Sequence, residues 1–154
     1  MSELMPGDRA PAFDLPADGG GRVNLTDYTG VWLVLYFYPK DDTPGCTTEA
    51  QDFQASLPAF EAKGARVLGV SKDSVKRHDK FKAKYGLGFP LAADEEGEMI
   101  ERYGAWVEKS LYGRQYMGID RSTFLIDPMG KIQAAWRKVR VPGHVTQVLA
   151  AIPD

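Results

Sequence analysis

Cys46 is the only cysteine in the chain of 154 residues, and its surroundings suggest chemistry at the sulfur. It follows an apolar run at 31–38 and a polar turn at 40–45. Apolar residues then recur at spacings of three and four, which predicts a helix beginning at the cysteine. A sulfur at a helix start lies near unpaired backbone N–H groups and the positive end of the helix dipole, which favour the thiolate. The position suits a reactive thiol, although a small buried hydrophobic residue would also fit there.

Two strands and two helices are predicted to position this cysteine. The apolar runs at 31–38 and 66–71 are typical of central strands covered on both faces. Helical stripes follow at 46–60, where Pro58 is expected to break or kink the helix, and from about Ser74 onward. This strand, helix, strand, helix order predicts parallel strands.

The rest of the chain completes a mixed sheet. The glycine run at 19–21 is typical of a tight turn, so an N-terminal β-hairpin is expected. Strands are predicted at 122–126 and 131–136, joined by a turn that makes them antiparallel. A short helix is predicted around Ile100, and a last helix begins near Gly143. The predicted fold class is therefore α/β, with a central mixed β-sheet and helices on both of its faces.

Charge and apolar content argue against several classes of protein. Lys and Arg number 19 against 21 Asp and Glu, a net charge of −2, so no strong field attracts nucleic acid or anionic lipid. The longest apolar run, 31–38, is far shorter than the ~20 residues that cross a membrane, and no secretory signal is recognised. A lone cysteine allows no intrachain disulfide, which favours a cytoplasmic location. One domain spanning 1–154 is expected because no linker or repeat divides the chain.

Two motifs connect the cysteine to a known family. Pro39, Thr43 and Cys46 form the pattern Pro-x-x-x-Thr-x-x-Cys, and Arg121 begins the stretch Arg-Ser-Thr-Phe-Leu-Ile-Asp. Together these motifs resemble the peroxiredoxins. The resemblance implies a thioredoxin-like fold, which agrees with the order of elements predicted above.

The wider sequence narrows the resemblance to one subfamily. The segments at 36–40, 43–49 and 116–126 are similar to the bacterioferritin comigratory protein, or peroxiredoxin Q, subfamily. Weaker similarity extends from about Gly7 to Val148, so nearly the whole chain is covered. The activity implied is reduction of hydrogen peroxide and organic hydroperoxides by a thiol, in antioxidant defence and redox homeostasis.

The resemblance also implies a role for each motif residue. Cys46 would attack a peroxide oxygen and become a sulfenic acid, Thr43 would face the peroxide, and Pro39 would shield the site from water. Arg121 would be the activating guanidinium. Gly45 and Glu49 would contribute to substrate binding.

Hydrogen-bond donors around the peroxide are expected to contribute more to the reaction rate than the acidity of the thiol does. Forming the thiolate gains little rate by itself, because a less basic sulfur is also a weaker nucleophile. Donors that bind the departing oxygen more strongly in the transition state must therefore supply most of the acceleration. The Arg121 guanidinium, the Thr43 hydroxyl and the amides of Gly45 and Cys46 are candidates. Glu49 is expected to stabilise the helix start as a first-turn carboxylate and to help organise the site.

The sequence departs from the subfamily at one position. Many members carry a resolving cysteine five residues after the first, where this chain has Gln51. An intramolecular disulfide is impossible, so a one-Cys mechanism with an external thiol reductant is predicted. Thioredoxin, glutathione with glutaredoxin, or another thiol are the candidate donors. No metal, haem or flavin is expected, and the subfamily resemblance suggests a monomer or weak homodimer.

Two other functions remain as alternatives. Cys46 could oxidise without turnover in a peroxide sensor or a binding module. A Cys-His hydrolase would instead need a histidine base beside the sulfur. His78 lies on the predicted buried stripe of a helix, and His144 is expected to face solvent. Trp106 and the aromatic residues at 112–116 are expected in a loop ahead of Arg121, at the site entrance, on a partner surface or in the core.

Overall fold

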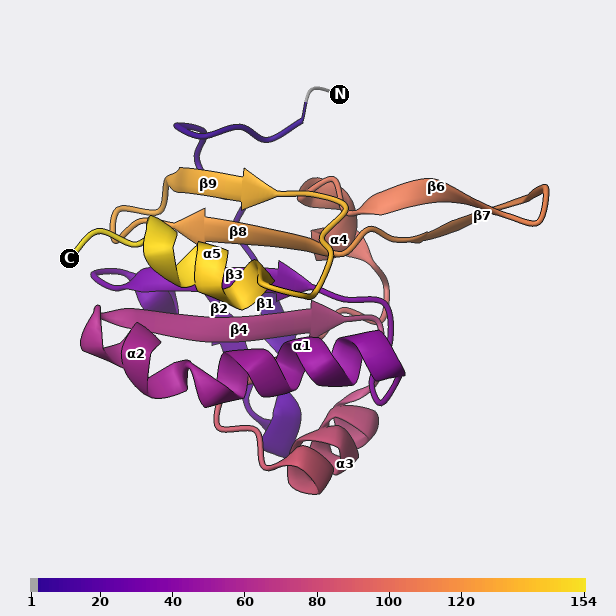
Figure 1. Cartoon of the computed structure of the whole chain (residues 1–154), viewed down its shortest axis with the longest axis horizontal. Helices are drawn as coiled ribbons and strands as arrows, with labels where there is room; N and C mark the ends of the chain where they lie inside the picture. The colour runs from indigo at the N-terminus through magenta and orange to yellow at the C-terminus, as the bar shows by residue number, and fades with distance from the viewer. Residues whose placement is uncertain (1–2) are drawn as a thin grey trace.

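A computed structural model describes residues 3–154, and a mixed five-stranded sheet organises them. The strands run in the order β5-β4-β3-β8-β9 (Figure 1). Their bounds are Trp32–Phe37 for β3, Ala65–Ser71 for β4, Leu91–Ala93 for β5, Ser122–Ile126 for β8 and Ile132–Trp136 for β9. β3 pairs in parallel with β4 and antiparallel with β8. The predicted α/β class with a mixed sheet is confirmed.

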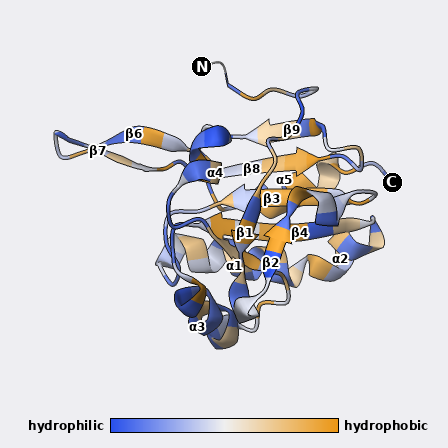
Figure 2. Cartoon of the chain, turned by 180° about the vertical axis from the view of Figure 1, so that it is seen from behind, coloured by the Kyte–Doolittle hydropathy of each residue, from blue (hydrophilic) through white to orange (hydrophobic). Residues whose placement is uncertain are grey.

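The central strand β3 is buried on both faces. Leu33, Leu35 and Phe37 belong to one apolar cluster, and the alternate residues Val34 and Tyr36 belong to the other. Because side chains alternate across a strand, a continuous apolar run serves both clusters. Figure 2 shows the central strands largely in hydrophobic colours and α3 mostly in hydrophilic ones.

Helices cover both faces of the sheet, as predicted. α1 (Pro44–Ala55), α2 (Leu57–Ala62) and α5 (His144–Ala151) share the cluster that contains Val34 and Tyr36 (Figure 1). The other cluster contains α4 (Glu98–Arg102) and the N-terminal hairpin of β1 (Asp14–Pro16) and β2 (Arg22–Asn24). α3 (Val75–Tyr85) lies beside β5 and the 3-10 segment η1 (Asp18–Gly20). A second such segment, η2, spans Leu25–Tyr28.

Several predicted boundaries coincide with structural ones. Pro58 occupies one of the first two positions of α2, and the helical stripe is divided at Ser56, as expected. Ser74 caps α3, its side chain accepting a hydrogen bond from the Arg77 N–H. Gly143 precedes α5 with a φ of 77°, a conformation that glycine adopts without strain. Among residues 3–154 no helix is long and apolar enough to cross a membrane.

The loop expected ahead of Arg121 is a β-hairpin, so that expectation was wrong. β6 (Trp106–Leu111) pairs with β7 (Arg114–Ile119), and the hairpin projects from the body (Figure 1). Tyr112 and Gly113 form the two-residue turn. Their φ angles of 51° and 79° are both positive, as in the tight turns whose backbone matches the twist of the flanking strands. Tyr112 is 97% exposed, which excludes core packing for that side chain. The three-residue strand β5 was not predicted at all.

Candidate active site

The sheet register brings Cys46 and Arg121 together. Phe37 at the end of β3 pairs with Ser122 at the start of β8, so Arg121 lies beside the point where the chain leaves β3. The chain then turns and enters α1, which carries Cys46. The Arg121 Nη2 donates a hydrogen bond to the Cys46 sulfur over 3.4 Å, joining residues 75 positions apart.

Cys46 lies in the first turn of α1, where backbone N–H groups have no partner within the helix. Thr43 is the N-cap, Pro44 and Gly45 are the first two helical residues, and Cys46 is the third. Proline fits there because its missing N–H would have no helical partner anyway. The Thr43 hydroxyl donates to the Lys40 carbonyl over 2.9 Å and makes no capping hydrogen bond to α1, so its lone pairs remain able to accept a hydrogen bond. The Cys46 side chain is buried, and the residue is 2% exposed.

Arg121 contacts two groups at once. Its Nη1 donates to the Glu49 Oε1 over 2.6 Å, while its Nη2 contacts the sulfur. Burial opposes the charge of the guanidinium, but Glu49 and Cys46 raise the pKa of Arg121 above its usual value. A planar fork that remains charged suits this bridging position, which a lysine ammonium could not reproduce.

Glu49 is a fully buried carboxyl with one free oxygen. Among residues 3–154, its Oε2 and the Tyr36 hydroxyl are the two buried side-chain polar atoms that have no hydrogen-bond partner. Burial raises the pKa of Glu49 to about 7, although the Arg121 charge and hydrogen bond act to lower it. The expectation that Glu49 stabilises the helix start was wrong, because α1 begins at Pro44 and Glu49 lies in the second turn. Its structural partner is Arg121.

The remaining predicted site residues differ in their surroundings. A Cβ atom on Gly45 would lie 3.2 Å from the Arg121 Nη2, so glycine allows the guanidinium to approach the helix start closely. Pro39 is exposed and follows Tyr38. The structure thus brings together Cys46, Arg121, Glu49 and Gly45, with Thr43 at the helix cap.

Sequence reasoning missed the burial of His144. The ring is buried, its Nε2 lies 2.7 Å from the Thr123 Oγ1, and it packs edge-on against Phe53 and Trp136. Burial, together with the nearby Arg121 charge, lowers the pKa of His144 to about 4, so the ring is neutral at neutral pH. The expectation of a solvent-facing residue was wrong because the partners come from other elements.

No histidine is placed to act as a base for Cys46. The His78 ring nitrogens contact the Asp41 carboxylate and the Ala92 carbonyl, and His144 contacts Thr123. The side-chain partner of the sulfur is Arg121. This arrangement does not support the hydrolase alternative. Within residues 3–154, no three His, Cys, Asp or Glu side chains gather as a metal site would require.

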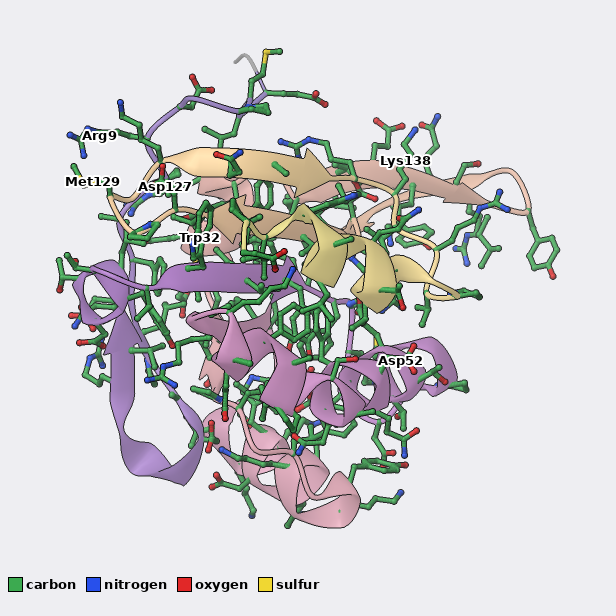
Figure 3. All side chains as sticks on the ribbon, turned by 60° about the vertical axis from the view of Figure 1, so that its left-hand side comes forward. Arg9, Trp32, Asp52, Asp127, Met129 and Lys138 are labelled. Atoms are coloured by element: carbon green, nitrogen blue, oxygen red, sulfur yellow. The ribbon has the colours of Figure 1, made fainter. Side chains whose placement is uncertain are left out.

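A separate hollow lies at the other end of the sheet. Arg9, Asp127 and Met129 line this cavity of about 180 Å³ (Figure 3). Lys138 marks the side of the molecule where Arg121 lies, because its backbone nitrogen is 3.4 Å from the Oδ2 of Asp120, the residue before Arg121. In Figure 3, Lys138 is on the opposite side of the view from Arg9 and Met129. The length of β8, roughly 15 Å, separates the hollow from Arg121. The hollow is therefore not part of the cysteine site.

Glu49→Gln is expected to remove a pH-dependent cost of folding. Burial raises the pKa of Glu49 above its ordinary value, so the folded protein favours the neutral carboxyl. The stability that depends on this neutral form is complete at low pH and is lost as pH rises through about 7. As pH rises from about 4 to about 8, the free energy of unfolding of the wild type should therefore fall relative to that of Glu49→Gln, by on the order of 3 kcal/mol. Urea unfolding at about pH 4 and about pH 8 measures the difference. An equal difference at both pH values would contradict the prediction.

The structure thus places a buried cysteine at the start of a helix, where its sulfur accepts a hydrogen bond from an arginine beside a neighbouring strand. Residues 6–135 match the model of the AhpC/TSA family. The chain belongs to this family and, within it, is a peroxiredoxin of the Bcp/PrxQ group.

Relatives match over nearly the whole chain. Peroxiredoxin Bcp of Xanthomonas campestris pv. campestris is 53% identical over 145 residues, covering 93% of this chain and 91% of that protein. Peroxiredoxin Bcp of Bacillus subtilis is 49% identical over 148 residues, covering 96% and 94%. The expected family is confirmed, and the chain is a thiol peroxidase.

Solved structures confirm the thioredoxin-like fold. Xanthomonas campestris peroxiredoxin Q superimposes with a TM-score of 0.87 at 52% identity, covering 91% of this chain and 89% of that one. A serine variant of Xylella fastidiosa PrxQ gives a TM-score of 0.92 at 47% identity, covering 97% and 96%. The Xanthomonas protein has also been solved with serine replacing cysteine at two different positions, whereas this chain has one cysteine.

Proposed function

We propose that this peroxiredoxin works by a one-Cys mechanism in which Cys46 is the peroxidatic thiol and Arg121 its main activating group. The observation that carries the proposal is the forked contact of Arg121 with the Cys46 sulfur and the Glu49 carboxyl. That contact holds a cation where negative charge develops as a peroxide bond breaks. Pro39 completes the site as a shield against water.

The first half-reaction oxidises the sulfur. The Cys46 thiolate attacks one peroxide oxygen, the O–O bond breaks, and the departing oxygen takes a proton to leave as water or an alcohol. The sulfur gains the other oxygen and becomes a sulfenic acid. The Thr43 hydroxyl, which already donates to the Lys40 carbonyl, accepts a hydrogen bond from the peroxide OH, while Arg121 and the Gly45 and Cys46 amides donate to the departing oxygen.

The second half-reaction requires an external thiol. Because the chain has no second cysteine, the sulfenic acid condenses with the donor thiol, releasing water and forming a mixed disulfide. A second thiol attacks this disulfide, restores the Cys46 thiol and leaves the donor as a disulfide. Thioredoxin, glutathione with glutaredoxin, or another thiol meets this requirement.

The proposed substrates are hydrogen peroxide and organic hydroperoxides. One solved relative, the Xanthomonas campestris bacterioferritin comigratory protein, is described as having alkyl peroxide reduction activity. We extend this class of substrate to the present chain. In the same proposal the protein acts in the cytoplasm as a monomer or weak homodimer, without metal, haem or flavin.

Intact-mass measurement during turnover tests the mechanism. One equivalent of hydrogen peroxide with a sulfenic-acid trap should give a single adduct, and glutathione in place of the trap should give one mixed disulfide at Cys46. Excess thiol should return the protein to its starting mass and sustain peroxide consumption. Oxidation without regeneration by glutathione, glutaredoxin or thioredoxin would favour the sensor alternative. A disulfide-linked dimer as the obligatory intermediate would contradict the one-Cys cycle.

A further inference from the structure

The turn that leads into Cys46 is bound to other elements by buried contacts. This catalytic turn, residues 40–45, connects β3 to α1. The Asp41 carboxylate accepts hydrogen bonds from the Tyr38 hydroxyl and from His78 on α3. The Asp41 backbone N–H donates to the Asp73 Oδ2 over 2.8 Å, and the Ser71 hydroxyl donates to the same oxygen. The conformation of the turn therefore depends on groups outside it.

His78 forms a bridge that needs two protons. Its Nδ1 lies 2.7 Å from the Asp41 Oδ2, and its Nε2 lies 2.9 Å from the Ala92 carbonyl oxygen in β5. Both of these partners are acceptors, whereas a neutral imidazole has a single N–H. Only the imidazolium satisfies both bonds. The ring is fully buried, so neither acceptor can be satisfied by bulk water instead.

The surroundings of His78 favour its charge. Tyr38, the residue after β3, places its hydroxyl 3.5 Å from the Nδ1, and Asp73 in the loop after β4 is the second nearby carboxylate. Burial opposes the charge, but the bonds to Asp41 and Ala92 and the nearby Asp73 raise the pKa of His78 above its ordinary value. The bridge is accordingly complete below that pKa and is lost as pH rises through it.

The backbone of the turn is strained and depends on contacts with α3. Asp42 has a φ of 60°, a left-handed conformation that is uncommon for residues other than glycine. Its carboxylate accepts hydrogen bonds from the Lys84 Nζ over 2.8 Å and from the Tyr85 hydroxyl over 2.7 Å. This second attachment is solvent-exposed, and exposed ion pairs contribute little. The buried bridge through Asp41 is therefore the stronger attachment.

The second half-reaction needs this turn to move. Cys46 is 2% exposed, so a thiol as large as glutathione can contact its oxidised sulfur only if the turn or the helix start shifts. The first half-reaction instead needs the sulfur held against Arg121. The two steps place opposite demands on the same turn.

We propose that doubly protonated His78 is a positioning residue for the peroxidase reaction: by joining Asp41 to the Ala92 carbonyl it holds the catalytic turn closed for oxidation and, when the bridge breaks, lets the turn open for reduction. The inference rests on the proposed function of Cys46. When His78 loses a proton, one of its two acceptors loses its donor, and the attraction between opposite charges disappears. Loss of the bridge should slow oxidation of the thiol and speed reduction of the sulfenic acid.

His78→Gln tests the bridge through the two half-reactions, measured separately by rapid mixing. Oxidation by hydrogen peroxide should be about tenfold slower, because misplacement by ~1 Å can cost on the order of 100-fold in rate. Reduction of the preformed sulfenic acid by glutathione should be about threefold faster, because the open turn is more populated. A merely destabilised protein would show no such opposite pair of effects.

Asp41→Asn is the second variant and keeps every hydrogen bond without a charge. Its amide N–H₂ can donate to a neutral Nδ1 while its oxygen accepts from Tyr38, and the Nε2–H still donates to Ala92. As pH rises from about 6 to about 10, wild-type oxidation should slow relative to this variant. Lys84→Met, which removes the exposed attachment of the same turn, should leave both half-reactions within about twofold of wild type.

The outcomes separate the bridge from the proposed function. If wild-type Cys46 is not oxidised by peroxide, the proposed function fails. If the wild type reacts but His78→Gln leaves both half-reactions unchanged, or slows both equally, the bridge does not position the turn. If His78→Gln does not fold, the pH comparison with Asp41→Asn decides, and superimposable profiles overturn the inference.

Discussion

Cys46→Ser should abolish peroxide turnover while leaving the fold intact. The serine hydroxyl can still accept the hydrogen bond from Arg121, so the site keeps its shape, but a neutral hydroxyl does not attack a peroxide bond. We expect the rate of thiol-dependent peroxide consumption to fall by at least about 1000-fold, equivalent to ~4 kcal/mol of transition-state stabilisation. Peroxide consumption with excess dithiothreitol measures the activity, and a thermal melt checks the fold.

A displaced thiol provides the matched control. Ser110 lies exposed on the β6–β7 hairpin, so Ser110→Cys in the Cys46→Ser background supplies an ordinary surface thiol. This double variant should react with peroxide no faster than free cysteine, because it lacks a helix start and Arg121. Activity near the wild-type level in either variant would show that the position of Cys46 is not what makes the thiol reactive.

Arg121→Ala should have the second largest effect, on both rate and stability. Removing one donor from a developing oxyanion typically costs about 100- to 1000-fold, and we expect a similar loss in the rate of Cys46 oxidation. The variant also leaves the buried Glu49 carboxyl without the guanidinium that contacts it. Breaking a buried ion pair by removing one partner costs about 3–5 kcal/mol, so the free energy of unfolding should fall as well.

A second substitution separates the two roles of Arg121. Without the guanidinium the pKa of Glu49 should rise further, so the loss of stability should grow as pH increases. Arg121→Ala combined with Glu49→Gln should recover most of the stability, because no buried carboxylate remains, yet it should not recover the oxidation rate. Urea unfolding and rapid-mixing oxidation test the two parts. Recovery of the rate together with the stability would mean that Arg121 acts only through folding.

Arg121→Lys distinguishes geometry from charge. Lysine keeps a positive charge but lacks the planar fork that contacts the Cys46 sulfur and Glu49 together. Its stability should lie near that of the wild type, and its oxidation rate should lie between those of the wild type and Arg121→Ala. A wild-type rate would show that a cation alone suffices.

Local patterns explain how much of the fold could be predicted. A short apolar run that is rich in β-branched and aromatic residues and shows no alternation is typical of a strand covered on both faces, and 31–38 contains β3. Ser74 and Pro58 mark helix boundaries because capping and the missing N–H of proline act within a single turn of helix. β5 was missed because three residues are too few to show a period. The β6–β7 hairpin was missed because most of its residues are exposed or half-buried and give no clear alternation.

The sequence by itself determined the four longer strands of the central sheet, the main helices, the chemistry available at one cysteine and, through its motifs, the family. The tertiary structure decided which groups meet that cysteine. The antiparallel register of β3 and β8 places Arg121 against a sulfur 75 residues away, and packing leaves Glu49 with that arginine as its partner. Burial of His144 and the bridge from His78 to Asp41 likewise join separate elements. Local propensity acts over a few residues, whereas these contacts depend on sheet register and packing, which the whole chain sets at once.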